Sequence, residues 1–142
     1  MTTPTKQYQP REVFQSAPYG FLATWDGQAP RLRPHAFVLQ AGKLWTSTYD
    51  ISGKVTEIEN TPAVEVAFVG NAMAQLRVSG HAAFVHDRQQ KELLLELNPK
   101  VRRHFPDADA EHFVLIEITP TRIRTKATGF CEYVDFPLDA LA

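Results

Sequence analysis

From Tyr19 onward the chain contains segments with the pattern of β-strands, in which side chains alternate between two faces with a two-residue period. The segments with this pattern are rich in β-branched and aromatic residues, which strands favour. A turn at Asp26-Gly27 follows the first segment and a turn at Ala41-Gly42 follows the second, so both predict hairpins. About seven strands are expected, at residues 19–25, 31–39, 44–49, 63–69, 74–86, 112–119 and 122–128.

Helices are expected where apolar residues fall three or four positions apart between a capping residue and a proline. Ser52 and Asp87 are the expected caps of two helices, and Pro18 ends an earlier one. The helical segments are residues 11–17, residues 52–59, the stretch after Asp87 that carries Leu93, Leu94 and Leu97, and a helical turn or two at 99–105. We assign the three leucines to the core.

The chain is expected to form a single domain over residues 1–142, with a polar N-terminal arm at about 1–9 and a tail at about 129–142. It contains no internal repeat, low-complexity block or linker-like stretch. Gly80 interrupts the long strand at 74–86 and predicts a bulge or a bend there. The fold class is therefore mainly β with a few helices, arranged as a mostly antiparallel barrel.

Charge and composition exclude several classes of protein. Fifteen Lys and Arg residues against sixteen Asp and Glu residues give a net charge of −1, so no broad positive field exists for nucleic acid or an anionic membrane. The polar N-terminus lacks the apolar run of a signal peptide and no segment could span a bilayer, so a cytoplasmic protein is expected. Cys131 is the single cysteine and the five histidines lack zinc spacing, so we expect no metal site.

Two neighbouring stretches favour an anion, and phosphate in particular. Arg31, Arg33 and His35 share one face of a strand, where they need an anion or open solvent. The hydroxyl residues 46–48 then precede Ser52-Gly53-Lys54 at the start of a helix, where phosphate is a natural guest. A solvated strand face and an ordinary helix cap are the alternatives.

Gln75 at the head of the long strand offers an acceptor and two donors, which suits the polar edge of a flavin or similar heterocycle. The alternative is a glutamine that faces solvent. A G-x-S-x-G elbow, a G-x-G-x-x-G turn and a P-loop are all missing from the sequence, which removes the standard hydrolase, dinucleotide and NTPase motifs.

In this order the features resemble the pyridoxamine 5'-phosphate oxidase-like, FMN-binding split-barrel family. Three runs carry the resemblance, closely over residues 20–87 and in element order to about 128: FLATWDGQAPRLRPHAF, LWTSTYDISGKVTEIENTPAVEVAFVG and QLRVSGHAAFVHD. The resemblance implies an antiparallel split β-barrel that holds FMN. Carried over residue by residue, it assigns the cofactor to Arg33 with its neighbours Pro34 and His35, and to Ser47, Thr48, Ser52, Lys54 and Gln75; the choice among Thr46, Ser47 and Thr48 stays open.

The later run KELLLELNPKVRRHFP is similar to small members of the family, and the chain lacks the tryptophan and Arg-Leu-Pro segment of the vitamin-pathway oxidase. The resemblance therefore implies an oxidoreductase that acts on another small molecule, with catalytic residues unknown. A non-catalytic protein that binds or senses flavin, deazaflavin or haem is the alternative function.

The resemblance also implies a homodimer with the flavin site at the subunit interface. The interior of so small a barrel is filled by its own side chains, so the flavin ring must lie outside it. Interfaces are enriched in aromatic residues, and the candidates are Trp45, Phe68, Phe130, Tyr133 and Phe136. The alternative is that all of them belong to one core with an ordered tail.

Overall fold

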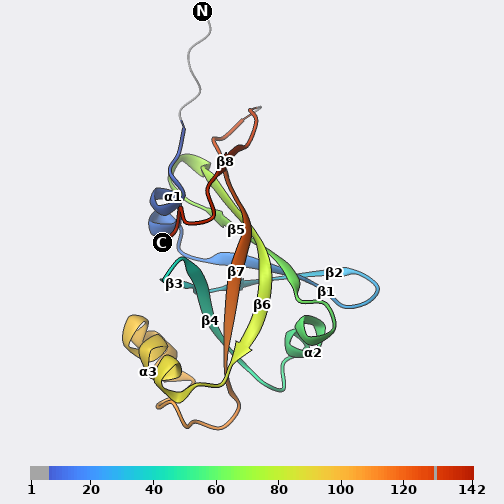
Figure 1. Ribbon diagram of the computed structural model, residues 1–142, viewed down its shortest axis with the longest axis vertical. Coiled ribbons are helices and arrows are strands. Elements are labelled where there is room, and N and C mark those ends of the chain that lie inside the picture. Colours follow the sequence, from blue (N-terminus) through green and yellow to red (C-terminus); the bar gives the residue numbers. More distant parts are fainter. Residues whose placement is uncertain (1–6, 130) are drawn as a thin grey trace, which may run out of the picture.

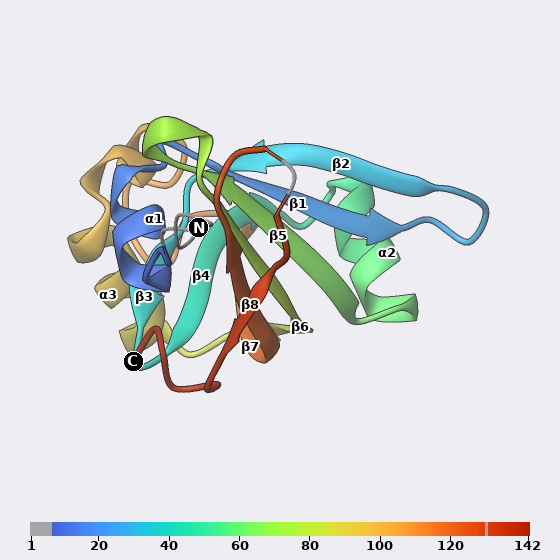
Figure 2. The same cartoon turned by 90° about the horizontal axis from the view of Figure 1, so that it is seen from above.

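The computed structural model describes residues 7–129 and 131–142, and over this part the protein is mainly β. Eight strands of the described residues form one antiparallel sheet in the order β2-β1-β5-β6-β7-β4-β3, with β8 paired to β7 (Figures 1 and 2). The sheet curls around a core but does not close, because β2 and β3 are left as its two edges, as in a split barrel. The strands are β1 Gly20–Trp25, β2 Pro30–His35, β3 Val38–Gln40, β4 Lys43–Tyr49, β5 Ala63–Val69, β6 Gln75–Val85, β7 Phe113–Lys126 and β8 Val134–Phe136.

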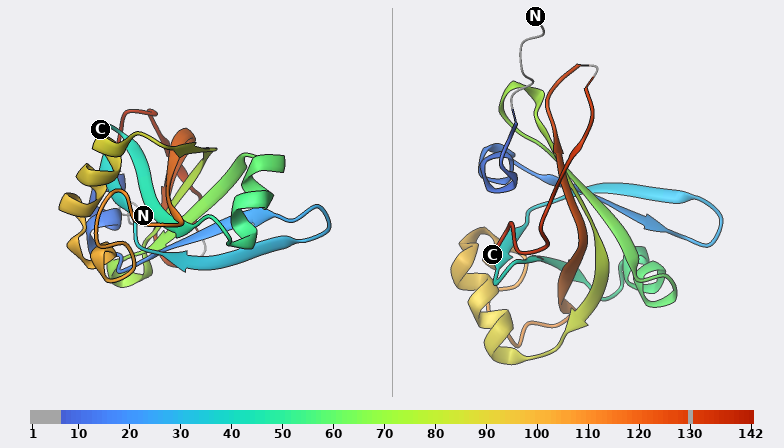
Figure 3. Two further views of the ribbon diagram at one scale, coloured as in Figure 1. Left: turned by 90° about the horizontal axis from the view of Figure 1, so that it is seen from below. Right: turned by 45° about the horizontal axis from the view of Figure 1, so that its top comes forward.

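The single strand predicted at 31–39 is wrong, because the chain divides there between the two edges of the sheet. β2 ends at His35 and β3 begins at Val38, and each pairs with a different strand. The Thr46 hydroxyl donates to the Ala36 carbonyl at 2.8 Å and holds the backbone at the break. Both predicted turns are present, and the β1–β2 hairpin projects from the body of the molecule (Figure 3).

The two strands predicted at 112–119 and 122–128 form a single strand, β7, which runs without interruption through Pro120. Opposite it, the β6 register shifts between Ser79 and Gly80, which confirms the predicted bulge. A Cβ atom on Gly80 would lie 2.6 Å from the Thr119 carbonyl oxygen, so this approach requires glycine. The bulge in β6 lets β7 continue through Pro120, which has no backbone N–H group. The tail adds the short strand β8, which was not expected.

The helices lie close to their predicted positions: α1 Pro10–Ser16, α2 Gly53–Asn60 and α3 Arg88–Leu97, with 3₁₀ turns η1 Asn71–Met73 and η2 Pro99–Arg103. Ser52 and Asp87 occupy the N-cap positions, but neither side chain makes a capping hydrogen bond. In the part of the chain that the structure covers, no helix combines the length and the hydrophobicity that crossing a membrane requires.

Two hydrophobic cores hold the sheet. The first fills the barrel around Leu22 and Phe68 and receives Val13 of α1 and Ile58 of α2. The second lies between β4, β7 and α3, where Trp45 packs with Leu94, Leu95, Phe105, Phe113 and Leu115. The leucine assignment holds for Leu94, whereas Leu97 is exposed.

The cores also take up most of the aromatic residues expected at an interface. Trp45 and Phe68 are buried, and Phe136 packs against the barrel core. Phe130 lies outside the described residues.

Candidate functional site

Arg31, Arg33 and His35 do share one face, as predicted, because they pair with Thr24, Leu22 and Gly20 of β1. The Arg31 side chain, which projects from β2, is bound to the hairpin turn. Its Nε donates to Asp26 Oδ2 at 2.7 Å. The backbone N–H groups of Ala29 and Gln28, with Arg31 after them, lower the pKa of Asp26 to about 2.

Arg33 is held by two side chains that the sequence did not suggest. Its Nη1 donates to Thr24 Oγ1 at 2.6 Å, and its Nη2 donates to Glu57 Oε2 at 3.0 Å. The Thr24 hydroxyl in turn donates to the same Glu57 oxygen at 2.8 Å. These bonds use the edge of the guanidinium formed by Nη1 and Nη2. The other edge, formed by Nε and the second hydrogen of Nη2, can bind an oxyanion.

Lys54 gathers the hydroxyl groups at the start of α2. Its Nζ donates to Thr48 Oγ1 at 2.9 Å and to Ser52 Oγ at 2.7 Å. Burial, and after it the charge of Arg33, lowers the pKa of Lys54, while Glu57 opposes the shift. Arg33 and Lys54 are therefore near neighbours. We call these residues the cation cluster: Arg33 and Lys54 with Thr24, Thr48, Ser52 and Glu57.

The three hydroxyl residues of β4 separate by the alternation of the strand. Thr46 and Thr48 are buried, and Thr48 belongs to the cation cluster. Ser47 lies on the opposite face and lines a depression of about 250 Å³ where β4 runs past the end of β3. The depression is lined by Pro34, His35, Ala36, Thr46, Ser47, Asn98, Lys100, Val101 and His104.

His35 lines the depression and is close enough to Lys54 and Arg33 of the cation cluster to feel their charges. Its Nδ1 lies 3.0 Å from Thr46 Oγ1. Burial first, then the charges of Lys54 and Arg33, lower the pKa of His35 to about 4. His35 is therefore uncharged at neutral pH, and the ionised side chains of the cation cluster carry one net positive charge.

Gln75 does not meet the cation cluster within the chain. It lies three strands away from β2, opposite Val69 of β5 and Lys126 of β7. We call the face of β2, β1, β5, β6 and β7 that is turned away from the barrel core the outer face. The Gln75 side chain lies on this outer face. Its Oε1 accepts a hydrogen bond from the Tyr133 hydroxyl at 3.2 Å.

The outer face also bears large apolar side chains on β1 and β2. Phe21, Trp25 and Leu32 are 38%, 44% and 68% exposed. They lie on the strand positions that alternate with the buried Leu22 and Thr24, so one sheet face carries all three.

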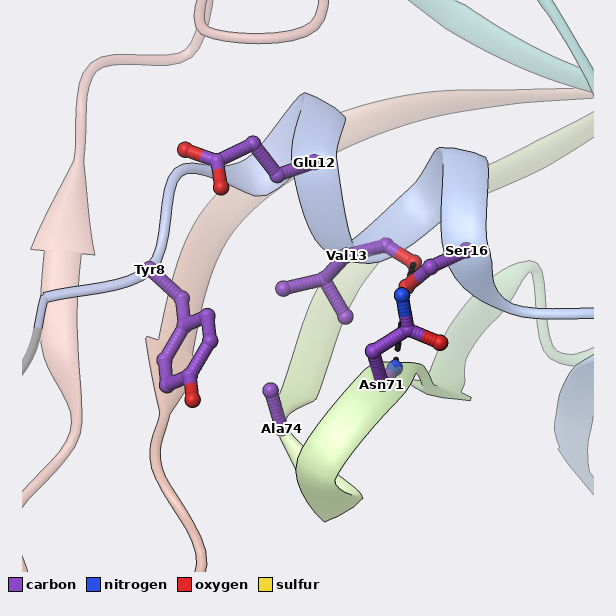
Figure 4. A pocket seen from close by; sticks show the side chains of 6 residues that line it. All are labelled: Tyr8, Glu12, Val13, Ser16, Asn71 and Ala74. Atoms are coloured by element: carbon purple, nitrogen blue, oxygen red, sulfur yellow. Dashed lines mark hydrogen bonds between the residues drawn. The ribbon is translucent and has the colours of Figure 1, made fainter.

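A second cavity, of about 130 Å³, lies between α1 and η1 (Figure 4). The Ser16 hydroxyl bridges the two elements, since it accepts from the Asn71 backbone N–H at 3.0 Å and donates to the Val13 carbonyl at 3.2 Å. Its lining contains Glu12 and no Lys or Arg, so it does not suit an anion.

The pyridoxamine 5'-phosphate oxidase family model matches residues 8–127, which is most of the chain. The protein belongs to this family. No curated protein matches the sequence.

Solved structures agree with the pyridoxamine 5'-phosphate oxidase assignment. General stress protein 26 from Bacillus anthracis str. Sterne is 25% identical with a TM-score of 0.75, and the match covers 90% of this chain and 96% of that chain. A pyridoxamine 5'-phosphate oxidase-related, FMN-binding protein from Nostoc punctiforme PCC 73102 is 20% identical with a TM-score of 0.64, over 82% and 78% of the two chains. A haem-binding protein from Mycobacterium smegmatis is 16% identical with a TM-score of 0.78, over 99% and 61%.

The pyridoxamine 5'-phosphate oxidase match contains the whole cation cluster, including Thr24 and Glu57, which the sequence reasoning missed. Glu57 could have been found from the sequence, because it lies one helical turn after Lys54 and therefore on the same side of α2. The sequence indicated Thr24 more weakly, as a hydroxyl residue at a core position of β1. The match ends before Tyr133, which contacts Gln75.

Proposed function

We propose that the protein is an FMN-binding flavoprotein and that the cation cluster holds the phosphate of the cofactor. The observation that carries the proposal is the convergence of Lys54 and Arg33 with two hydroxyl groups at the start of α2. Lys54 uses two of its three N–H donors on hydroxyl groups, and Arg33 keeps one edge for a ligand.

The charges and donors of the cation cluster suit a phosphate monoester, which carries about −1.5 to −2 charges at neutral pH. The cluster has one net positive charge, and Glu57 is engaged by Arg33 and Thr24. The N-terminal end of α2 adds its own partial positive charge beside Ser52. Bidentate contact from Arg33 and a point charge from Lys54 would together fix the phosphate.

We further propose a homodimer in which Gln75 of a second copy completes the site. Within one chain Gln75 and the cation cluster lie on different faces of the sheet, so a shared ligand needs Gln75 from another molecule. The exposed apolar side chains of β1 and β2 lie on the same outer face as Gln75 and would be covered by such a partner.

When bound, FMN supplies redox chemistry, and the protein binds and orients it. A small substrate would enter by the depression beside His35, where Ser47, Asn98 and Lys100 offer hydrogen-bond groups. We do not expect this substrate to be pyridoxamine phosphate, because residues 1–142 contain no Arg-Leu-Pro motif and no tryptophan after Trp45, the features that mark substrate binding in the vitamin-pathway oxidase. His35 would act there as a neutral group.

The second candidate function is non-catalytic binding of flavin, deazaflavin or haem. The fold is shared with the haem-binding protein from Mycobacterium smegmatis. His35 and His104 line one depression, and imidazole is a common haem ligand.

The deciding experiment is the absorbance spectrum of the purified protein, followed by titration with FMN, haem and a deazaflavin. Stoichiometric FMN binding that prefers FMN to riboflavin supports the proposal. Tight binding of haem or deazaflavin with none of FMN contradicts it. Reduction of bound FMN by NADH or NADPH separates an oxidoreductase from a store, and turnover of pyridoxamine phosphate at about 1 per second or faster would contradict the substrate argument.

A further inference from the structure

The short turn between β4 and α2 carries Ser52 of the cation cluster, and it is fastened to the chain that enters β7. The Ser52 backbone N–H donates to the Tyr49 carbonyl at 2.9 Å, which closes the turn. The Asp50 backbone N–H donates to the His112 carbonyl at 3.0 Å. Because His112 directly precedes β7, a residue far along the chain anchors the turn that leads into α2.

The side chain of His112 holds the same residue of the turn. His112 Nδ1 lies 2.7 Å from Asp50 Oδ1, and because a carboxylate only accepts, Nδ1 donates this hydrogen bond. His112 Nε2 lies 3.5 Å from Glu111 Oε1, on a side chain that is 88% exposed. The close partner of His112 is therefore Asp50, which it holds by the backbone N–H and by the carboxylate.

The backbone of His112 lies in the left-handed region, with φ at 66°. Residues other than glycine rarely adopt this conformation, although histidine and asparagine adopt it more often than most. In this conformation both the carbonyl and the imidazole of His112 contact Asp50. Backbone strain of this kind persists where surrounding contacts fix it, and it gathers at functional sites. The two contacts with Asp50 hold His112 in this conformation.

Asp50 is an anion in the turn that leads to an anion site, since it lies only four positions before Lys54. A free carboxylate there would repel a phosphate and compete with it for Lys54. Besides burial, the charges that shift the pKa of Lys54 are those of Arg33 and Glu57. The Asp50 carboxylate is bound by His112 instead.

We propose that His112 is a positioning residue for the phosphate of FMN and that it acts through Asp50. Its carbonyl and imidazole fix the turn that brings Ser52 and Lys54 to the phosphate, and its imidazole holds the Asp50 carboxylate away from them. This inference rests on the proposed function and adds to it a residue outside the cation cluster. Because His112 acts on the phosphate end of the cofactor, its loss weakens the binding of FMN and spares that of riboflavin.

The test is the affinity of the full chain and of its His112 variants for FMN and for riboflavin, measured by fluorescence titration. His112→Ala removes the imidazole, and it is expected to raise the Kd of FMN by about 5- to 10-fold and that of riboflavin by less than about twofold. His112→Gly adopts the left-handed backbone without strain but lacks the imidazole, so it is expected to lose the same affinity. His112→Asn keeps the left-handed preference and an N–H donor, and its Kd for FMN is expected to stay within about twofold of wild type.

A double-mutant cycle tests whether His112 acts through Asp50. In the Asp50→Ala background the carboxylate is gone, so the addition of His112→Ala is expected to change the Kd of FMN by less than about twofold. His86→Ala is the control, because His86 is also an exposed histidine next to a strand, after the end of β6. This control is expected to bind FMN as wild type does.

The outcomes separate the inference from the function on which it rests. Selective loss of FMN affinity in His112→Ala and His112→Gly, with recovery in His112→Asn, supports the inference. Equal losses for FMN and riboflavin overturn it, because His112 would then support the fold alone, and so does the same loss from His112→Ala with and without Asp50. The proposed function stands in both of these cases. A wild-type chain that binds no FMN ends the proposed function and the inference together.

Discussion

The hydroxyl group of Thr46 sets the tautomer of His35. Thr46 donates its single hydroxyl proton to the Ala36 carbonyl, 2.8 Å away, so it can only accept from His35 Nδ1 at 3.0 Å. The neutral ring therefore carries its proton on Nδ1, and Nε2 keeps a lone pair. The same threonine therefore contacts both His35 and the backbone at the break between β2 and β3.

His35 makes stability depend on pH between about 6.5 and 4. Its pKa falls from an ordinary 6.5 to about 4 in the folded protein, so in this window the unfolded chain binds a proton that the folded chain refuses. Acidification through the window therefore destabilises the fold, by on the order of 2 kcal/mol. Urea unfolding of wild type and His35→Asn across this range measures the effect, since asparagine keeps a donor for Thr46 and does not titrate. Parallel curves for the two proteins would contradict the prediction.

Lys54→Ala is expected to weaken FMN binding by about 10- to 100-fold, because a charged hydrogen bond is worth roughly 1.5–3 kcal/mol. Riboflavin has no phosphate, so its binding is expected to change little. Lys43→Ala is the control, because Lys43 lies at the start of β4 and pairs with Glu117 and not with a residue of the cation cluster. Fluorescence titrations give both affinities, and equal losses for FMN and riboflavin would refute the assigned role of Lys54.

Thr24→Val tests whether Thr24 positions Arg33. The change removes the acceptor of Arg33 Nη1 and the donor to Glu57, at similar side-chain volume. FMN binding is expected to weaken by about 3- to 10-fold with riboflavin unaffected, and stability to fall by about 1–2 kcal/mol. Thr125→Val is matched, since Thr125 is also buried and its hydroxyl donates to the Tyr8 carbonyl. A similar loss of FMN affinity in both variants would show an effect of stability alone.

Gly80→Ala is expected to destabilise the protein by about 1–3 kcal/mol, because its Cβ would meet the Thr119 carbonyl oxygen at the bulge. Gly53→Ala provides the comparison. A Cβ on Gly53, the first residue of α2, meets nothing within 4 Å, so alanine is expected to cost no stability there. Thermal unfolding of both variants measures the difference. A neutral Gly80→Ala would mean that β7 can shift away from β6.

The predictable parts of the fold are those that local pattern determines. The strand predicted at 63–69 is observed with the same bounds, and Gly80 marked the bulge. The break after His35 was missed because apolar residues continue through 37–39, and a tertiary hydrogen bond from Thr46 holds the backbone there. Pro120 was taken as the end of a strand, but the bulge opposite Gly80 accommodates it.

In the candidate site, too, contacts between residues close in the sequence were predictable and contacts between distant elements were not. Lys54 contacts Ser52 and Thr48, as the sequence indicated, because Thr48 and Lys54 are only six positions apart and the start of a helix brings them together. The contacts of Arg33 with Thr24 and Glu57 join β2 to β1 and α2, and no spacing in the sequence reports them. Gln75 and Arg33 lie on opposite faces of the sheet. This could be known only from the order of the strands, which the sequence alone does not give.

Leu32→Asp is expected to weaken the proposed dimer, because Leu32 is the most exposed of the large apolar side chains on the outer face of β1 and β2. Burying an unpaired carboxylate in an interface centre is expected to raise the dimer dissociation constant by roughly 10- to 30-fold. Leu138→Asp is the control, since Leu138 is also exposed but lies in the tail after β8. Sedimentation velocity over a dilution series compares the variants with wild type.

The same dilution series with FMN tests whether the site is shared. If Gln75 of one copy and Lys54 of the other bind one ligand, FMN must tighten the dimer by the factor by which dimerisation tightens FMN. Leu32→Asp is then expected to lose FMN affinity at concentrations where it is a monomer and to regain it when concentrated. Leu138→Asp is expected to behave as wild type throughout. A monomer that binds FMN at full affinity would contradict the dimer as the binding species and would place the whole site, without Gln75, within one chain.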